Sequence, residues 1–265
     1  MLQNIAIGQY VPGQSFLHRA DPRSKLLFIV LFATLVFLGN NTITYSILIG
    51  FTLFTILLSR LSFTYILKSL KPVWFLILFT VILHIFITKG GTVYYQWGSF
   101  TIEEQGVRQA IFISIRLGLL ILFSSLLTLT TSPMDLTEGL ERLLRPFGRI
   151  GVPVHEIALM MSIALRFIPT LMEETDKIIK AQTARGADFT SGNLVRRAKN
   201  LIPIAIPLFI SAFRRAEELA LAMEARGYRG GVGRTRLNKL QFTWRDVAIA
   251  VVAAALTFVI WWWRT

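Results

Sequence analysis

The 265-residue sequence contains no cysteine, which excludes disulfides, thiol catalysis and thiolate metal sites. Histidine is nearly absent too: His18, His84 and His155 are scattered along the chain, so we expect no metal site and no cofactor. Charged residues make up only 16% of the chain, where a soluble domain carries about 25%. Acidic residues are especially few, which leaves a formal net charge of +13. An ordinary soluble fold and a disulfide-stapled fold are both excluded.

Hydrophobic residues are abundant instead, at 54% of the chain, and the mean hydropathy is +0.58. About 20 mostly apolar residues cross a bilayer as a helix, because a helix pairs its own backbone polar groups. Five apolar runs predict such spans, at residues 26–39, 42–59, 72–88, 110–131 and 247–263. The sequence therefore predicts an all-α, polytopic membrane bundle, with six or seven spans left open.

The charges between the runs predict the orientation and the domains. Lys and Arg favour the cytoplasmic side, and they dominate the N-terminal segment and the connection after the second run. We expect a cytoplasmic segment 1–25, four transmembrane helices within 26–131, a cytoplasmic coupling domain at 132–245 and a C-terminal transmembrane helix within 246–265. The expected location is the cell membrane, with the N-terminus inside.

The segment 132–245 predicts three helices, at 133–149, 154–185 and 193–226, the first with Ser132 as its N-cap. The second and third begin apolar and become charged, and prolines interrupt their apolar halves. Two further membrane spans would fit these halves. Their short length favours long helices lying partly in the membrane interface.

The second and third helices end in the same pattern, Ala-x-x-Ala-Arg-Gly, with the arginines 41 positions apart. A glycine here predicts a helix end in the left-handed conformation, and the preceding arginine is stabilised at the helix end by about 0.3–1 kcal/mol. One such helix end would be ordinary, but two copies indicate two docking elements that bind partner proteins. An arginine suits this role because its guanidinium can bind a carboxylate bidentately. The predicted partner-binding residues are Ala184, Arg185, Gly186, Ala225, Arg226 and Gly227.

Three segments accompany these helix ends: His18-Arg19-Ala20-Asp21-Pro22-Arg23-Ser24-Lys25, Ser132-Pro133 and Met223-Glu224-Ala225-Arg226-Gly227-Tyr228. Together with the helix ends, they resemble the EcfT family, the transmembrane coupling subunits of energy-coupling factor (ECF) vitamin transporters. The resemblance implies a non-catalytic scaffold that binds two ATP-binding-cassette ATPases and one small membrane S-component, which captures the vitamin or other micronutrient. It further implies that Arg185 and Arg226 each dock in an ATPase groove. ATP-driven motion of the ATPases would then tilt the S-component and release its substrate inside.

Three alternatives can be compared with this interpretation. An intramembrane enzyme is not expected, because His84 and Arg116, the polar candidates at span depth, make no acid–base pair. Nucleic-acid binding is not expected either, because basic runs on the cytoplasmic side of a membrane protein typically contact anionic lipid headgroups. The basic residues of these runs are Arg196, Arg197, Lys199, Arg229, Arg234, Arg236 and Lys239. A stand-alone channel or secondary transporter with a basic regulatory domain remains the alternative, although no repeat relates the spans.

Overall fold

The computed structural model describes residues 10–97, 100–187, 189, 193–230 and 242–263. The chain divides into two compact units, each described by itself below. Among the described residues, the bundle unit consists of those within 10–140 and 242–263, and the arm unit consists of those within 141–230.

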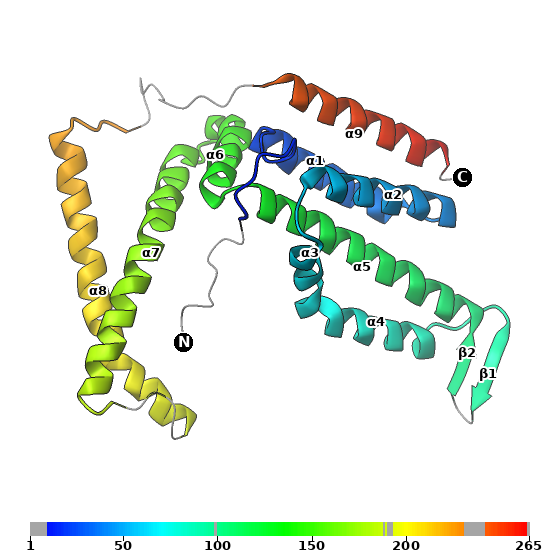
Figure 1. The fold of residues 1–265 in the computed structure, drawn as a ribbon, viewed down its shortest axis with the longest axis horizontal. Helices are drawn as coiled ribbons and strands as arrows, with labels where there is room; N and C mark the ends of the chain where they lie inside the picture. The colour runs from blue at the N-terminus through cyan, green and yellow to red at the C-terminus, as the bar shows by residue number, and fades with distance from the viewer. Residues whose placement is uncertain (1–9, 98–99, 188, 190–192, 231–241, 264–265) are drawn as a thin grey trace. The chain divides into compact units, whose positions relative to one another are not determined.

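The bundle unit is built almost entirely from helices (Figure 1). Its elements are α1 (Pro22–Leu38), α2 (Thr42–Ser59), α3 (Phe63–Leu70), the 3₁₀ turn η2 (Lys71–Val73), α4 (Trp74–Ile87), β1 (Val93–Trp97), β2 (Phe100–Glu103), α5 (Glu104–Thr130) and α9 (Trp244–Trp262), with the first part of α6 (Pro133–Leu144). Helix α5 is its centre and packs against α1, α2, α3 and α4. Stacked phenylalanines join the helices, with the rings of Phe32 and Phe123 4.1 Å apart.

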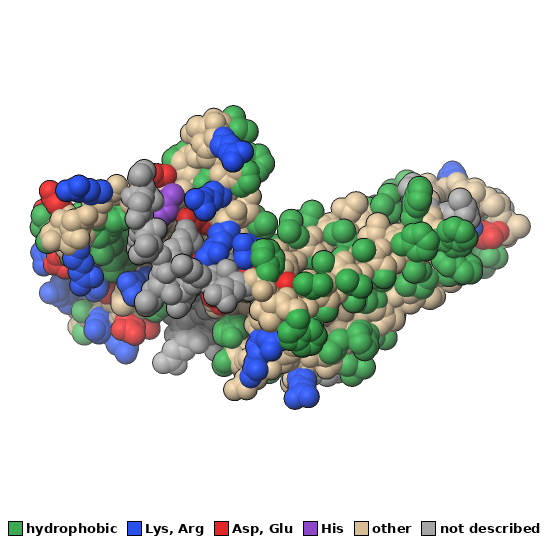
Figure 2. Space-filling view, turned by 90° about the horizontal axis from the view of Figure 1, so that it is seen from above, with side chains coloured by type: hydrophobic (Ala, Val, Ile, Leu, Met, Phe, Trp, Pro, Cys, Tyr) green, Lys and Arg blue, Asp and Glu red, His purple; other side chains and the backbone are tan. Residues whose placement is uncertain are grey.

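The outer surface of the bundle unit is apolar. Hydrophobic side chains dominate the part of this unit seen in Figure 2, whereas Lys and Arg side chains gather on the arm unit. Within the described residues, five helical stretches are long and apolar enough to cross a membrane, at Thr42–Ser59, Thr64–Ile87, Glu104–Thr130, Val154–Ala184 and Trp244–Trp262. The protein is therefore an all-α, polytopic membrane protein, as the sequence predicts.

The five stretches are not the five expected. Helix α1 has 17 residues, one fewer than the shortest of them, and α7 (Val154–Ala184) is among them although we expect it at the interface. The stretch Thr64–Ile87 also starts earlier than the predicted run 72–88, because α3, η2 and α4 follow one another without a break. Pro72 lies inside this path, in η2. A proline has no N–H for the α-helical ladder, and the 3₁₀ turn accommodates it.

A β-hairpin lies between α4 and α5, where the sequence predicts only a connection. Strands β1 and β2 pair antiparallel, with Val93 opposite Glu103 and Gln96 opposite Thr101. Gly90 and Gly91, which lie between α4 and β1, both have positive φ, and the Gly90 N–H donates to the Glu103 carboxylate. This hairpin is a small addition that leaves the fold class unchanged.

The arm unit contains the end of α6, the 3₁₀ turn η3 (Arg145–Ile150), α7 and α8 (Leu194–Ala225). Both long helices continue through their prolines, Pro169 in α7 and Pro203 and Pro207 in α8, so the helices predicted at 154–185 and 193–226 are confirmed. They run in opposite directions and pack against each other (Figure 1). An ion pair between Arg215 and Glu174, 3.0 Å long, joins them.

Candidate functional site

The first predicted site is the end of α7, which closes in a Schellman motif. Gly186 has φ +87°, in the left-handed region where a side chain would be strained. Its N–H donates to the Thr183 carbonyl at 2.9 Å, and the Ala187 N–H donates to the Gln182 carbonyl at 3.0 Å. The helix end is thus a fixed shape rather than a frayed turn, and Arg185 is its last residue before the reversal.

The end of α8 repeats this geometry bond for bond. Gly227 has φ +69°, its N–H donates to the Glu224 carbonyl at 2.8 Å, and the Tyr228 N–H donates to the Met223 carbonyl at 3.0 Å. The expectation that a left-handed glycine ends both helices is confirmed. We call Ala184-Arg185-Gly186 the first tip and Ala225-Arg226-Gly227 the second tip.

All six tip residues are exposed. Among the described residues, neither Arg185 nor Arg226 forms an ion pair. Each guanidinium therefore projects from a rigid helix end with its donors available, in the geometry that suits a carboxylate fork. The alanine before each arginine leaves the tip narrow.

The two tips lie at opposite ends of the α7–α8 pair. The helices meet around Phe167 of α7 and Ala216 of α8, and from there each runs to its own tip. At 1.5 Å per residue, the two paths sum to about 40 Å, and the separation of the two helix axes adds about 8–10 Å to the upper limit on the distance between the tips. The pair can therefore present two separate contacts to two receptors.

Side chains from three elements meet beside the second tip. The Tyr228 hydroxyl lies 3.5 Å from Nε2 of His155 at the start of α7, and Nδ1 of the same ring lies 3.1 Å from Glu141 of α6. With a neutral imidazole, Tyr228 donates to His155 and His155 donates to Glu141. We call this chain the Tyr228 strap, and it links the second tip to the other end of α7.

An apolar groove lies where α7 and α8 cross. It has a volume of about 250 Å³ and is lined by Ile163, Phe167, Leu171, Ala212, Arg215, Ala216, Leu219, Ala220 and Met223. The Arg215 guanidinium donates to the Glu174 carboxylate, 3.0 Å away, across the same crossing. The crossing thus combines an apolar surface with a polar link.

The motif before the first apolar run joins three helix ends. Asp21 accepts from the Arg23 backbone N–H at 2.8 Å, which caps α1, and the Arg23 guanidinium holds the same carboxylate at 2.9 Å. The Asp21 N–H donates to Asp246 at 2.9 Å, and Asp246 caps α9 by accepting from the Thr243 N–H. Asp21 is the N-cap of α1, and Asp246 in the first turn of α9 completes a capping box with the N-cap Thr243, so both carboxylates lie at positive helix ends.

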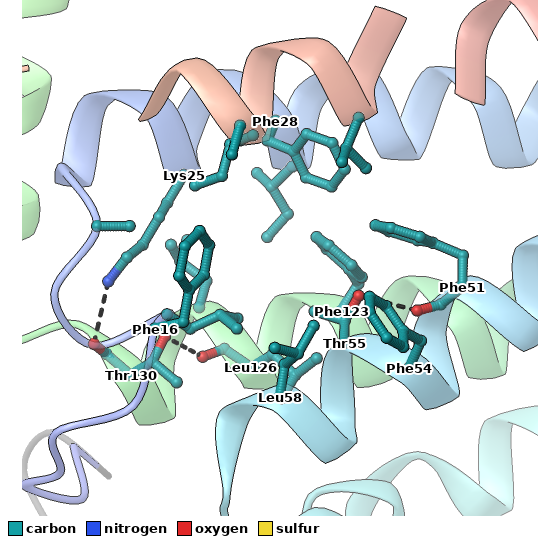
Figure 3. Close-up of a pocket in the computed structure, with 17 residues that line it drawn as sticks. Phe16, Lys25, Phe28, Phe51, Phe54, Thr55, Leu58, Phe123, Leu126 and Thr130 are labelled. Atoms are coloured by element: carbon teal, nitrogen blue, oxygen red, sulfur yellow. Dashed lines mark hydrogen bonds between the residues drawn. The ribbon is translucent and has the colours of Figure 1, made fainter. Parts of the chain in front are cut away.

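Lys25 completes this arrangement, which we call the helix-end clamp. The Lys25 ammonium donates to the Thr130 carbonyl at the end of α5, 3.2 Å away (Figure 3), and it also donates to the Thr131 hydroxyl, 2.9 Å away. The first residues of α1, the last of α5 and the first of α9 are therefore at one face of the bundle unit. The sequence pointed to this motif only through a family resemblance, and Asp246 was missed because it lies 225 positions from Asp21.

The two polar residues expected at span depth have partners within the bundle unit. The Arg116 guanidinium donates to the Tyr45 hydroxyl at 2.8 and 3.1 Å and lies over the Phe37 ring. His84 lies 3.1 Å from the Thr88 hydroxyl. Both side chains thus have hydrogen-bond partners in the structure, and Tyr45 is a partner that no sequence signal indicates.

Within the described residues, no group of three or more His, Asp or Glu side chains could hold a metal ion. Of the basic runs, Arg234, Arg236 and Lys239 lie outside the described residues, as do the side chains of Arg196 and Arg197. Ser132 is the expected N-cap of α6: its hydroxyl accepts from the Asp135 N–H at 3.1 Å.

Comparison with known proteins identifies the family of the chain. Residues 13–237 match the family model of the cobalt transport protein CbiQ. The chain is 86% identical to the energy-coupling factor transporter transmembrane protein EcfT of Brevibacillus brevis, over the whole of both sequences. It is 54% identical to the EcfT proteins of Bacillus subtilis, over 97% of this chain and 98% of the relative, and of Acidaminococcus fermentans, over 97% and 95%.

Proposed function

The chain belongs to the cobalt transport protein (CbiQ) family, as a transmembrane component of an energy-coupling factor transporter, and from this premise we propose that its two tips dock two ATPase subunits. The observation that carries the proposal is the repeated helix end, with Arg185 and Arg226 each exposed in the same Schellman geometry. A rigid end with an available guanidinium suits a carboxylate-lined groove on a partner.

The separation of the tips supports two ATPases rather than one. Each ATPase takes one tip, so a change in the distance between the ATPases becomes a rotation of α7 against α8. The crossing with Glu174 and Arg215 is the pivot of that rotation. ATP binding and hydrolysis belong to the ATPases, and this chain is the non-catalytic part that transmits the motion.

The apolar part of the crossing is the proposed contact for one small membrane S-component. The groove residues Phe167 and Leu171 face Ala216 and Leu219, and rotation of the helices changes the shape of this surface. The S-component would tilt with it and release its substrate, a vitamin or another micronutrient. The choice of substrate lies in the S-component.

The helix-end clamp supports the expected orientation in the cell membrane. Because the start of α1, the end of α5 and the start of α9 share one face, the N-terminal segment and the coupling segment 132–245 leave the bundle unit on the same side. Both segments are rich in Lys and Arg, which favours the cytoplasm for that side. The domain division at 25, 131 and 245 follows from this topology.

Co-purification tests the proposal. The full-length chain with a C-terminal tag, extracted from native membranes in mild detergent, should retain two ATP-binding-cassette ATPase chains and one small multispan protein per chain. A chain that purifies alone and still transports a solute in liposomes would contradict the proposal. That result would favour the alternative interpretation, a stand-alone channel or secondary transporter.

A further inference from the structure

A cavity of about 260 Å³ lies among α1, α2, α5 and α9, inside the bundle unit (Figure 3). Its lining is almost entirely apolar, and the aromatic rings of Phe28, Phe51 and Phe123 form much of it. The residues that line it are Phe16, Leu17, Ala20, Lys25, Phe28, Ile29, Phe51, Phe54, Thr55, Leu58, Phe123, Leu126, Leu127, Thr130, Ala248, Ile249 and Val252.

The cavity opens between α2 and α9. Three of its lining side chains are themselves exposed, Phe54 and Leu58 of α2 and Val252 of α9, so they form the rim. Both helices are membrane-spanning by length and composition. The opening therefore faces the hydrocarbon of the bilayer.

Water is a poor occupant of this space. A water molecule has a share of about 30 Å³ in the liquid and needs two to four polar partners, whereas an apolar cavity stays dry and takes up hydrocarbon. The polar atoms at the edge are engaged already: the Lys25 ammonium donates to Thr130 and Thr131, and the Thr55 hydroxyl donates to the Phe51 carbonyl. An acyl chain is the hydrocarbon that the surrounding solvent offers.

Cationic residues surround the end of the cavity that lies at the helix-end clamp. Lys25 is part of the lining, and Arg19 lies between the lining residues Leu17 and Ala20. Arg245 precedes the lining residue Ala248 by three positions, and its guanidinium lies 3.5 Å from the Arg19 carbonyl. Among the described residues, neither Arg19 nor Arg245 pairs with a carboxylate.

An indole ring marks the same level. Trp244, the first residue of α9, packs edge-on against Phe16 at 5.6 Å between ring centroids. Tryptophan favours the headgroup level of a bilayer, and Lys and Arg there attract anionic lipid by about 1 kcal/mol per residue. The apolar cavity thus ends at a basic, headgroup-level rim.

We propose that this cavity binds one acyl chain of an anionic glycerophospholipid, with its phosphate held at Arg19 and Arg245. The lipid fills the space between α2 and α9 and rests against the helix-end clamp. It is a structural ligand of the bundle unit, and its binding is independent of ATPase docking at the tips.

Filling the cavity tests the proposal. Ala248 lines it, whereas Ala250 is exposed on the same helix and does not, so Ala248→Phe and Ala250→Phe form a matched pair. The probe is palmitoyl-oleoyl phosphatidylglycerol, with the phosphatidylcholine of the same chains for comparison. The full-length chain with its co-purifying subunits is incubated with the lipid in detergent and washed to remove unbound lipid. Native mass spectrometry then measures how many lipid molecules each chain retains.

We expect one retained phosphatidylglycerol per chain in the unchanged protein and in Ala250→Phe, and at least tenfold less in Ala248→Phe. Val252→Phe, at the rim, provides a second test should Ala248→Phe fail to fold, which its melting temperature reports. Equal retention by a folded cavity variant and by Ala250→Phe would overturn the proposal.

The headgroup is tested separately. Arg245→Gln should lower the preference for phosphatidylglycerol over phosphatidylcholine about fivefold, while Arg60→Gln, an exposed change at the end of α2, should leave it unchanged. Equal retention of the two lipids by the unchanged protein would overturn the anionic part of the assignment.

Discussion

At the scale of single residues, Gly186 and Gly227 decide the shape of the two tips. A β-branched residue in the left-handed region costs roughly 1–2 kcal/mol, so Gly186→Val and Gly227→Val should each release the last helical turn. We expect the Ala187 or Tyr228 amide, respectively, to exchange its hydrogen about 5 to 30 times faster, as measured by hydrogen–deuterium exchange of the purified complex.

Gly148 is the matched control. It has equally open space around its Cα but an ordinary φ, so Gly148→Val should leave both tips unchanged. If the tip variants exchange at the rate of the Gly148 variant, the Schellman caps do not hold the tips.

The pair of Arg116 and Tyr45 is the other residue-scale feature with a measurable consequence. Tyr45 is 2% exposed, so Tyr45→Phe leaves the guanidinium without its acceptor and should lower the free energy of unfolding by about 1–3 kcal/mol. Unfolding in mixed micelles measures this loss. Tyr65→Phe, at an exposed tyrosine, should cost little. A double variant with Arg116→Leu that is no better than Tyr45→Phe alone would contradict the pairing.

At the scale of elements, the two tips differ in what supports them. The Tyr228 strap connects the second tip to α6 and to the start of α7. In His155→Ala the strap is lost, which removes about 1 kcal/mol of local stability, and exchange across 223–228 should become several-fold faster. The first tip, across 181–187, is the control in the same molecule and should be unaffected. Equal protection of the second tip in both proteins would exclude the strap.

Elements were predictable where one local signal decides them. The apolar runs and the capping residues Ser132, Gly186 and Gly227 predict helices that the structure contains. The run 72–88 was predicted to start later than the stretch Thr64–Ile87 does, because α3 and the turn η2, which contains Pro72, lead into α4 without a break. The hairpin was missed because its two short strands are stabilised mainly by each other.

At the scale of the whole molecule, the proposed orientation is open to a direct check. The chain has no cysteine, so each introduced cysteine is the only thiol. Asn40→Cys, between α1 and α2, should react with a membrane-impermeant maleimide in intact cells, and Arg149→Cys, in η3, only after permeabilisation. The reverse labelling pattern would show that the topology is inverted. Labelling of both cysteines in intact cells would place both positions on the outer side of the membrane and contradict the proposed orientation.

Contacts between distant parts of the chain could not be predicted. Asp21 with Asp246, Arg116 with Tyr45 and Tyr228 with His155 join positions that no periodicity relates. Each is a polar pair whose partner is decided by how helices pack. A single sequence therefore indicated the tips, which are local, but not the clamp and the strap that position helix ends.

The central claim is that Arg185 and Arg226 hold the ATPases. Charge reversal tests it most directly: Arg185→Glu and Arg226→Glu are compared with Arg214→Glu, an exposed arginine within α8 and away from both tips. Loss of a buried, charge-assisted contact costs about 2–5 kcal/mol. The ATPase held at the altered tip should therefore fall at least tenfold, which leaves about half of the co-purifying ATPase in each single variant, whereas Arg214→Glu should retain both ATPases. Equal ATPase content in all three would contradict the account.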